Sequence, residues 1–126
     1  MTCLLDTHFL IWVLAKSKRL RQFRWLEDYR PWGVSPFSLL EVQILFETGR
    51  IRLASDLASG VMSDSRFVLD EAPAVTVVQK ALGLSWTRDP FDRLIVAHSL
   101  ARKLPLCSVD SNIVKNHPLI VRDLRS

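Results

Sequence analysis

The stretch Cys3–Trp12, CLLDTHFLIW, decides how the rest of the sequence is interpreted. Residues 2–6, TCLLD, have the composition of a short buried strand, and residues 8–15, HFLIWVLA, continue at once with an apolar helical pattern. Asp6 stands between them, although an unpaired carboxylate is costly to bury. Its position predicts a helix cap or a functional group at the end of the first strand.

The composition is that of a globular protein, because 48% of the 126 residues are hydrophobic and 24% are charged. The length suits a single domain over residues 1–126. No apolar run reaches the roughly 18 residues that a membrane span needs. Asp6 also interrupts the N-terminal apolar stretch, so it does not read as a secretory signal. We therefore expect a cytoplasmic protein with no membrane partner.

Strand and helix patterns alternate along the whole chain. Further strands are predicted at residues 31–35, 66–72, 105–110 and 119–124. Helices are predicted at residues 8–15, 19–30, 35–49, 52–64, 73–84 and 88–104, with a short helix or turn at 111–118. This alternation predicts a layered α/β fold around a mostly parallel sheet.

Four carboxylates fall where such a fold would gather them. Asp6 and Asp110 each end a predicted strand, and the carboxyl ends of parallel strands share one edge of a sheet. Glu41 lies on the inward side of the helix 35–49, and Asp92 lies in the first turn of the helix 88–104. We therefore expect these four side chains to approach one another.

Each acid also has a purely structural explanation. Asp6, Asp89 and Asp110 suit helix caps, Asp92 suits the positive end of a helix, and Glu41 could pair with an arginine. Carboxylates gathered at one edge would repel one another, however, and a divalent cation relieves that repulsion. Oxygen ligands without histidine or cysteine suit Mg²⁺ or Mn²⁺, and such ions activate water for attack on phosphoesters.

The motifs resemble those of PIN-domain ribonucleases, and specifically the VapC-like toxins of type II toxin–antitoxin systems. The likeness rests on LLDTHFLIW, on VSPFSLLEVQILFETGRI and on TRDPFDRLIVAHSLARKLPLCSVD, in this order and spacing over nearly the whole chain. The resemblance implies a three-layer α/β/α fold, cleavage of RNA with Mg²⁺ or Mn²⁺, a homodimer, and inhibition by a small cognate antitoxin.

The resemblance also implies roles for individual residues. Asp6, Glu41 and Asp92 match the three core acids of the family and Asp110 matches the fourth. Asp6 and Asp92 would bind the metal directly, whereas Glu41 and Asp110 would act through water or complete a second ion site. Supporting roles at the site's margin fall to four neighbours, namely Thr7, Ser108, Asp89 and Arg93.

Basic residues are concentrated in one segment of a chain whose net charge is +4. These basic residues could bind an RNA backbone or could form an ordinary solvated helix face. They are Lys16, Lys18, Arg19, Arg21, Arg24 and Arg30. The same region contains apolar residues that we expect to form a dimer surface, around Trp25, Leu26 and Trp32.

Three alternatives compete with a metal-dependent ribonuclease. A haloacid-dehalogenase phosphatase needs a second aspartate two residues after the nucleophile, where this chain has His8. A phospho-receiver domain needs an acidic pair near the first strand and a late lysine, where this chain has Asp110. The third alternative, a catalytically silent PIN-like module that binds RNA or a protein, stays open because intact acids do not exclude it.

Overall fold

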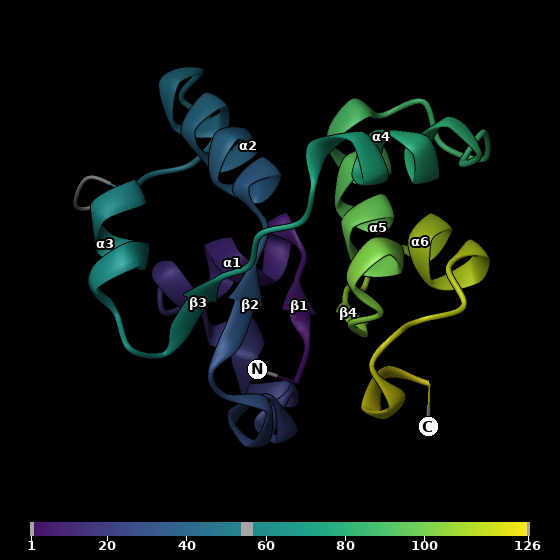
Figure 1. The fold of residues 1–126 in the computed structure, drawn as a ribbon. Coiled ribbons are helices and arrows are strands. Elements are labelled where there is room, and N and C mark those ends of the chain that lie inside the picture. Colours follow the sequence, from purple (N-terminus) through teal and green to yellow (C-terminus); the bar gives the residue numbers. More distant parts are fainter. Residues whose placement is uncertain (1, 54–56, 126) are drawn as a thin grey trace.

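The computed structural model describes residues 2–53 and 57–125, and its centre is a four-stranded parallel sheet (Figure 1). The strand order is β3-β2-β1-β4, and Leu4 of β1 pairs with Gly33 on one side and with Leu106 on the other. The strands are short, with bounds β1 Leu4–Leu5, β2 Trp32–Val34, β3 Phe67–Leu69 and β4 Leu106–Cys107. The predicted parallel α/β architecture is confirmed.

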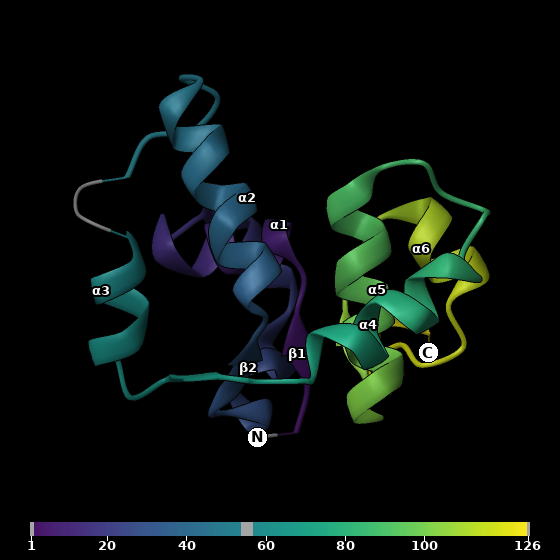
Figure 2. The same ribbon diagram turned by 45° about the horizontal axis from the view of Figure 1, so that its top comes forward.

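Helices cover both faces of this sheet, and the alternation of side chains in β1 shows how. Leu5 points into a core that also contains Phe9 of α1 and Val42 of α2, whereas Leu4 points to the opposite face and packs with Ile95 of α5. Figures 1 and 2 show the resulting three layers. The helices are α1 Thr7–Leu14, α2 Pro36–Glu47, α3 Leu57–Ser63, α4 Ala74–Leu82, α5 Pro90–Arg102 and α6 Ser111–Asn116.

The start of α2 follows directly from its sequence. Ser35 lies in extended conformation before the helix, and its Oγ accepts a hydrogen bond from the backbone N–H of Phe37 at 3.2 Å. Pro36 occupies the first helical position, where its missing N–H costs nothing. This cap sets the register of the helix and thereby the side on which Glu41 lies.

The predicted helix over residues 19–30 is wrong in type. Two 3₁₀ helices, η1 Lys18–Gln22 and η2 Arg24–Tyr29, meet at Phe23, whose φ of −120° and ψ of 52° are not helical. The ring of Phe23 lies 5.1 Å from that of Phe9 and stacks on that of Trp12 at 6.2 Å. Packing of this aromatic side chain into the core outweighs helical propensity here.

The predicted last strand over residues 119–124 is reduced to one bridge. Ile120 pairs in parallel with Leu106, after which the chain enters the 3₁₀ helix η3 Arg122–Leu124. The predicted helix over residues 52–64 is observed as α3, and residues 54–56 of that prediction lie outside the described residues. Within the described ranges, no helix has the length and apolar character to cross a membrane.

Candidate active site at the carboxyl ends of the strands

The four predicted acids come from four different elements. Asp6 immediately follows β1, Asp110 follows the adjacent strand β4 by three residues, Glu41 lies in α2 and Asp92 lies in the first turn of α5. Burial, together with the negative charges of Asp89, Asp110, Glu41 and Asp6, raises the pKa of Asp92 to about 7. The structure therefore brings the predicted acids within electrostatic reach of one another.

Asp6 is the most enclosed of these acids, with 4% of its surface exposed. The pKa of this carboxyl is raised to about 6, mainly by burial and to a smaller extent by the charge of Asp110. Hydrogen bonds from the Phe9 backbone and from the Ser108 side chain, together with the nearby His8, act in the opposite direction. The balance leaves Asp6 short of favourable partners for its charged form.

The cap role predicted for the aspartates is also correct. Each uses Oδ1 to accept a backbone N–H at 2.9 Å, with Asp6 capping α1, Asp89 capping α5 and Asp110 capping α6. A cap engages one of the two carboxylate oxygens and fixes the direction of the whole group. Capping and a functional role are therefore compatible, because the cap itself positions the carboxylate at the sheet edge.

Two hydroxyl groups hold acids in place, as the sequence predicted. Thr7 is buried and its Oγ1 donates a hydrogen bond to Oε1 of Glu41. Ser108 is fully buried, bonds Asp6, and accepts the backbone N–H of Asp110 at 3.2 Å. Burial raises the pKa of Glu41, and the Thr7 hydroxyl partly offsets that rise.

Arg93 does not point freely into the site. Its Nε donates to the backbone carbonyl of Leu84 at 2.9 Å, which ties α5 to the chain that follows α4. Asp89 is exposed at the start of α5, where its charge raises the pKa of both Asp92 and Glu41. Asp89 is thus a helix cap and an electrostatic neighbour of the cluster.

The carboxylate oxygens of this cluster are the kind of ligand that a hard divalent cation prefers, but they are not arranged to coordinate one as they stand. Carboxylate oxygens are the preferred ligands of Mg²⁺ and Mn²⁺, and a cation would relieve the repulsion that raises the pKa values of Asp6 and Asp92. Among the described residues, however, no three acidic, histidine or cysteine side chains converge closely enough to hold an ion as they stand. Side-chain rotation must accompany binding.

Sequence reasoning missed a second buried carboxylate, Asp70, directly after β3. Nε2 of His98 lies 2.9 Å from its Oδ2, and Nε of Arg102 donates to the same oxygen at 3.1 Å. The other ring nitrogen of His98 lies 2.9 Å from Oγ of Ser35, the cap of α2. The signal was present, because Asp70 directly follows the apolar residues of the strand predicted over residues 66–72. This network connects β3, α2 and α5.

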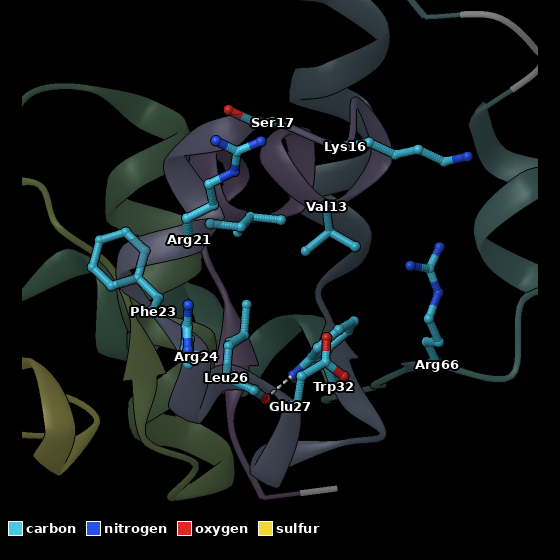
Figure 3. Close-up of a pocket in the computed structure, with 11 residues that line it drawn as sticks. Val13, Lys16, Ser17, Arg21, Phe23, Arg24, Leu26, Glu27, Trp32 and Arg66 are labelled. Atoms are coloured by element: carbon cyan, nitrogen blue, oxygen red, sulfur yellow. Dashed lines mark hydrogen bonds between the residues drawn. The ribbon is translucent and has the colours of Figure 1, made fainter.

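A pocket of about 410 Å³ lies toward the opposite ends of the strands (Figure 3). Trp32, the first residue of β2, lies on its floor and donates Nε1–H to the carbonyl of Leu26 at 2.8 Å. The other lining residues are Val13, Lys16, Ser17, Leu20, Arg21, Phe23, Arg24, Glu27 and Arg66. Part of the predicted basic cluster therefore lines an apolar pocket away from the acids.

The predicted dimer surface is wrong for two of its three residues. Leu26 is 3% exposed and Trp32 is 1% exposed, so both belong to the core. Large exposed apolar side chains lie elsewhere, notably Val75, Val78 and Leu82 of α4. The sequence could not separate these groups, because an apolar residue in an irregular segment has no periodicity that reveals its orientation.

Comparison with known proteins agrees with this geometry. The sequence profile of the family described as PIN domain matches residues 3–116. Ribonuclease VapC22 from Mycobacterium tuberculosis is 30% identical over 122 residues, covering 93% of this chain and 94% of the relative. A toxin–antitoxin complex from Klebsiella pneumoniae contains a chain with the same fold, with a TM-score of 0.70, 18% identity, and coverage of 95% and 96%. The chain belongs to the PIN-domain family and, within it, to the VapC-like proteins.

Proposed function

We propose that the protein is a metal-dependent endoribonuclease and the toxin component of a type II toxin–antitoxin system. Asp6, Glu41, Asp92 and Asp110 would hold Mg²⁺ or Mn²⁺, with Asp6 and Asp92 as direct ligands. The observation that carries the proposal is the raised pKa of three carboxyls from three separate elements, Asp6, Glu41 and Asp92, caused by burial and by neighbouring negative charge. The substrate would be cellular RNA, so the proposal requires a cytoplasmic location.

In the proposed hydrolysis, the main task of the protein side chains is to hold the four carboxylates in place. Asp6 is fixed by its cap, Glu41 by Thr7, and Asp110 by its own cap and by Ser108. The bound ion would supply Lewis acidity and an activated water for in-line hydrolysis of a phosphodiester. Before binding, the raised pKa of Asp92, about 7, lets this group carry a proton near neutrality, which it releases as a cation arrives.

A cleavage assay tests the proposal. The protein and its Asp6→Asn variant are incubated with labelled total RNA in Mg²⁺, Mn²⁺ or EDTA. We expect cleavage only by the parent protein and only with a metal. Equal cleavage by both proteins would identify a contaminating nuclease and leave the assigned site without support.

A catalytically silent module that binds RNA or protein is the second candidate. It is favoured by the absence, among the described residues, of a three-ligand group that could hold an ion as it stands. The two candidates differ in their response to metal, since an ion that binds only the folded protein raises its melting temperature. A melting temperature that ignores both Mg²⁺ and Mn²⁺ would favour the silent module.

For the antitoxin partner we propose the pocket around Trp32. Its apolar floor and its cations, including Lys16, Arg24 and Arg66, complement an amphipathic acidic segment of a protein. RNA bound there would lie toward the amino ends of the strands, whereas the acids follow the carboxyl ends. The pocket therefore suits a protein partner better than the substrate whose phosphodiester is cleaved.

For the homodimer we propose the outer face of α4. Val75, Val78 and Leu82 are 69%, 47% and 75% exposed and lie three and seven residues apart, so they share one side of the helix. Figure 2 shows α4 lying beside α5. Light scattering at micromolar concentration is expected to give a dimer for the parent protein and a monomer for Val78→Asp.

A further inference from the structure

A pocket beside the acids has no role in the functions described above. It has a volume of about 410 Å³ and lies between α6, η3 and the chain that leaves β4. The lining residues are Ser108, Val109, Ser111, Val114, Lys115 and Leu124. The volume falls within the range of small-ligand sites, which makes the composition of its walls informative.

Ser108 joins this pocket to the acidic cluster. It lines the pocket, and the same side chain bonds Asp6 and accepts the backbone N–H of Asp110 at 3.2 Å. A ligand in the pocket is therefore separated from two of the proposed metal ligands by one buried hydroxyl-bearing residue. An extended ligand in this pocket would reach the acids with its next chemical group.

The pocket exposes apolar surface directly beside Asp110. Val109 is 41% exposed although it stands between Ser108 and Asp110, and Val114 and Leu124 are half-buried beside it. Apolar surface gains free energy when a flat apolar ligand displaces its water. The face of a nucleobase is such a ligand, and bases bind by stacking without requiring a particular sequence.

Polar groups complete the pocket. Lys115 lies in the last turn of α6, and within the part of the chain that the structure describes no carboxylate forms an ion pair with it. Its ammonium group is therefore available to an anion. Ser111 is exposed at the first position of α6 and offers a hydroxyl that can donate or accept.

We propose that this pocket is a nucleotide subsite that holds one nucleotide of the RNA next to the bond that the acids cleave. The base packs on Val109, Val114 and Leu124, and Lys115 pairs with a backbone phosphate. The inference rests on the proposed ribonuclease function. An acidic peptide is disfavoured as the occupant, because its carboxylates would face Asp6 and Asp110 without bringing the flat apolar surface that the walls accept.

Binding is tested first without metal or turnover. The full chain, with labelled valine and leucine methyl groups, is titrated by NMR in EDTA with AMP, CMP, GMP and UMP. We expect saturable shifts concentrated at the methyl groups of Val109, Val114 and Leu124 for at least one nucleotide. Shifts that are absent, or that spread evenly over the surface, would overturn the subsite and leave a protein segment as the better occupant.

Matched variants separate the pocket from general effects of charge and apolarity. Lys115→Gln is paired with Lys80→Gln, because both lysines lie in the last turn of a short helix. Val109→Ser is paired with Val68→Ser, because the two valines are 41% and 39% exposed. The pocket variants are expected to weaken nucleotide binding about three- to tenfold, and the controls are expected to bind as the parent does. Equal weakening by pocket and control variants contradicts the proposal.

Kinetics with single-stranded RNA distinguish a failed subsite from a failed function. We expect Lys115→Gln and Val109→Ser to raise KM about three- to tenfold with kcat nearly unchanged. Lys115→Gln should also reduce the slope of log binding constant against log salt by about 0.7, the value of one phosphate contact on a single strand. Metal-dependent cleavage with unaltered KM in both variants overturns the subsite alone. Nucleotide binding without any cleavage supports the subsite and overturns the ribonuclease function.

Discussion

Asp6 and Asp70 are two carboxylates in nearly the same structural position with opposite electrostatics. Each follows a strand of the parallel sheet, and each is 4% exposed. The pKa of Asp6 is raised to about 6, mainly by burial and to a smaller extent by the charge of Asp110. Burial also raises the pKa of Asp70, but Arg102 and His98 outweigh that effect and bring it below its usual value.

The difference teaches which buried acid is structural. Asp70 has the partners that a buried charge requires, so His98 and Arg102 offset the free energy lost when this carboxylate leaves water. Asp6 and its acidic neighbours accept hydrogen bonds from hydroxyl and backbone groups. Among the described residues, no lysine or arginine side chain donates a hydrogen bond to them as Arg102 does to Asp70. A carboxylate that is left in this condition is suited to a ligand with positive charge, which is the condition expected of a metal site.

The largest expected effect separates the two acids by activity. Asp6→Asn should reduce RNA cleavage by more than about a thousandfold, because the metal loses a direct charged ligand. The metal-free protein should remain as stable as the parent or become more stable, because repulsion with Asp110 is relieved. Cleavage rates and urea unfolding in EDTA measure both quantities, with Asp70→Asn as the buried-carboxylate control. Because asparagine can still cap α1, an unfolded Asp6→Asn protein would mean that the fold itself needs the charge of Asp6.

The second effect is the opposite response of Asp70. Asp70→Asn should lower the free energy of unfolding by about 3 kcal/mol, because His98 and Arg102 lose a charged partner in a buried position. Urea unfolding at pH 7 measures the change. His117→Gln is a matched control, since it alters the other buried histidine that bonds a serine, at 2.9 Å from Ser99. If Asp70→Asn leaves stability unchanged, the network is not the source of the low pKa.

Much of this comparison was predictable from the sequence, because strand-end aspartates are visible as a pattern. Asp6, Asp110 and the caps of α5 and α6 follow from local rules about apolar runs and short polar side chains. The partners of Asp70 were not predictable, since His98 and Arg102 lie 28 and 32 residues away in sequence. Only the tertiary fold, which brings these α5 side chains next to the residue that follows β3, decides that this acid, and not Asp6, receives them.

The irregular segment from Lys18 to Tyr29 escaped prediction for a related reason. Its apolar spacing fits a helix, but Phe23 enters the aromatic cluster of α1 and breaks the helical backbone there. Leu26 and Trp32, which looked like a surface for a partner, lie in the same hydrophobic core as Phe9. Local patterns therefore placed the aspartates correctly at the boundaries of strands and helices but misjudged the apolar residues, because burial depends on contacts distant in sequence.

A third effect is the pH dependence of stability in EDTA. The raised pKa values of Asp6, about 6, and Asp92, about 7, mean that the folded protein keeps protons that the unfolded chain releases above about pH 4. These groups therefore make the free energy of unfolding fall as pH rises from about 4 to 7. In Asp6→Asn, the free energy of unfolding should fall much less over this pH range than it does in the parent protein.

The measured quantity is the difference between the parent and Asp6→Asn from pH 4.5 to 7.5. Burial lowers the pKa of His117 to about 4, below its unfolded value of 6.5, so His117 makes stability rise with pH in the same window. That contribution is common to both proteins and cancels in the difference. A difference that stays constant with pH would mean that Asp6 ionises as an ordinary surface aspartate.

The smallest effect concerns which partner holds Asp70. The side chain of His98 is 1% exposed and that of Arg102 is 44% exposed, although both bond the same carboxylate oxygen. Water can replace much of what an exposed guanidinium provides, whereas nothing replaces a buried imidazole. His98→Leu should therefore destabilise the protein clearly more than Arg102→Gln, as measured by urea unfolding. Glutamine at position 98, with a donor and an acceptor of its own, should recover part of the loss, and the reverse order of the two variants would make Arg102 the principal partner.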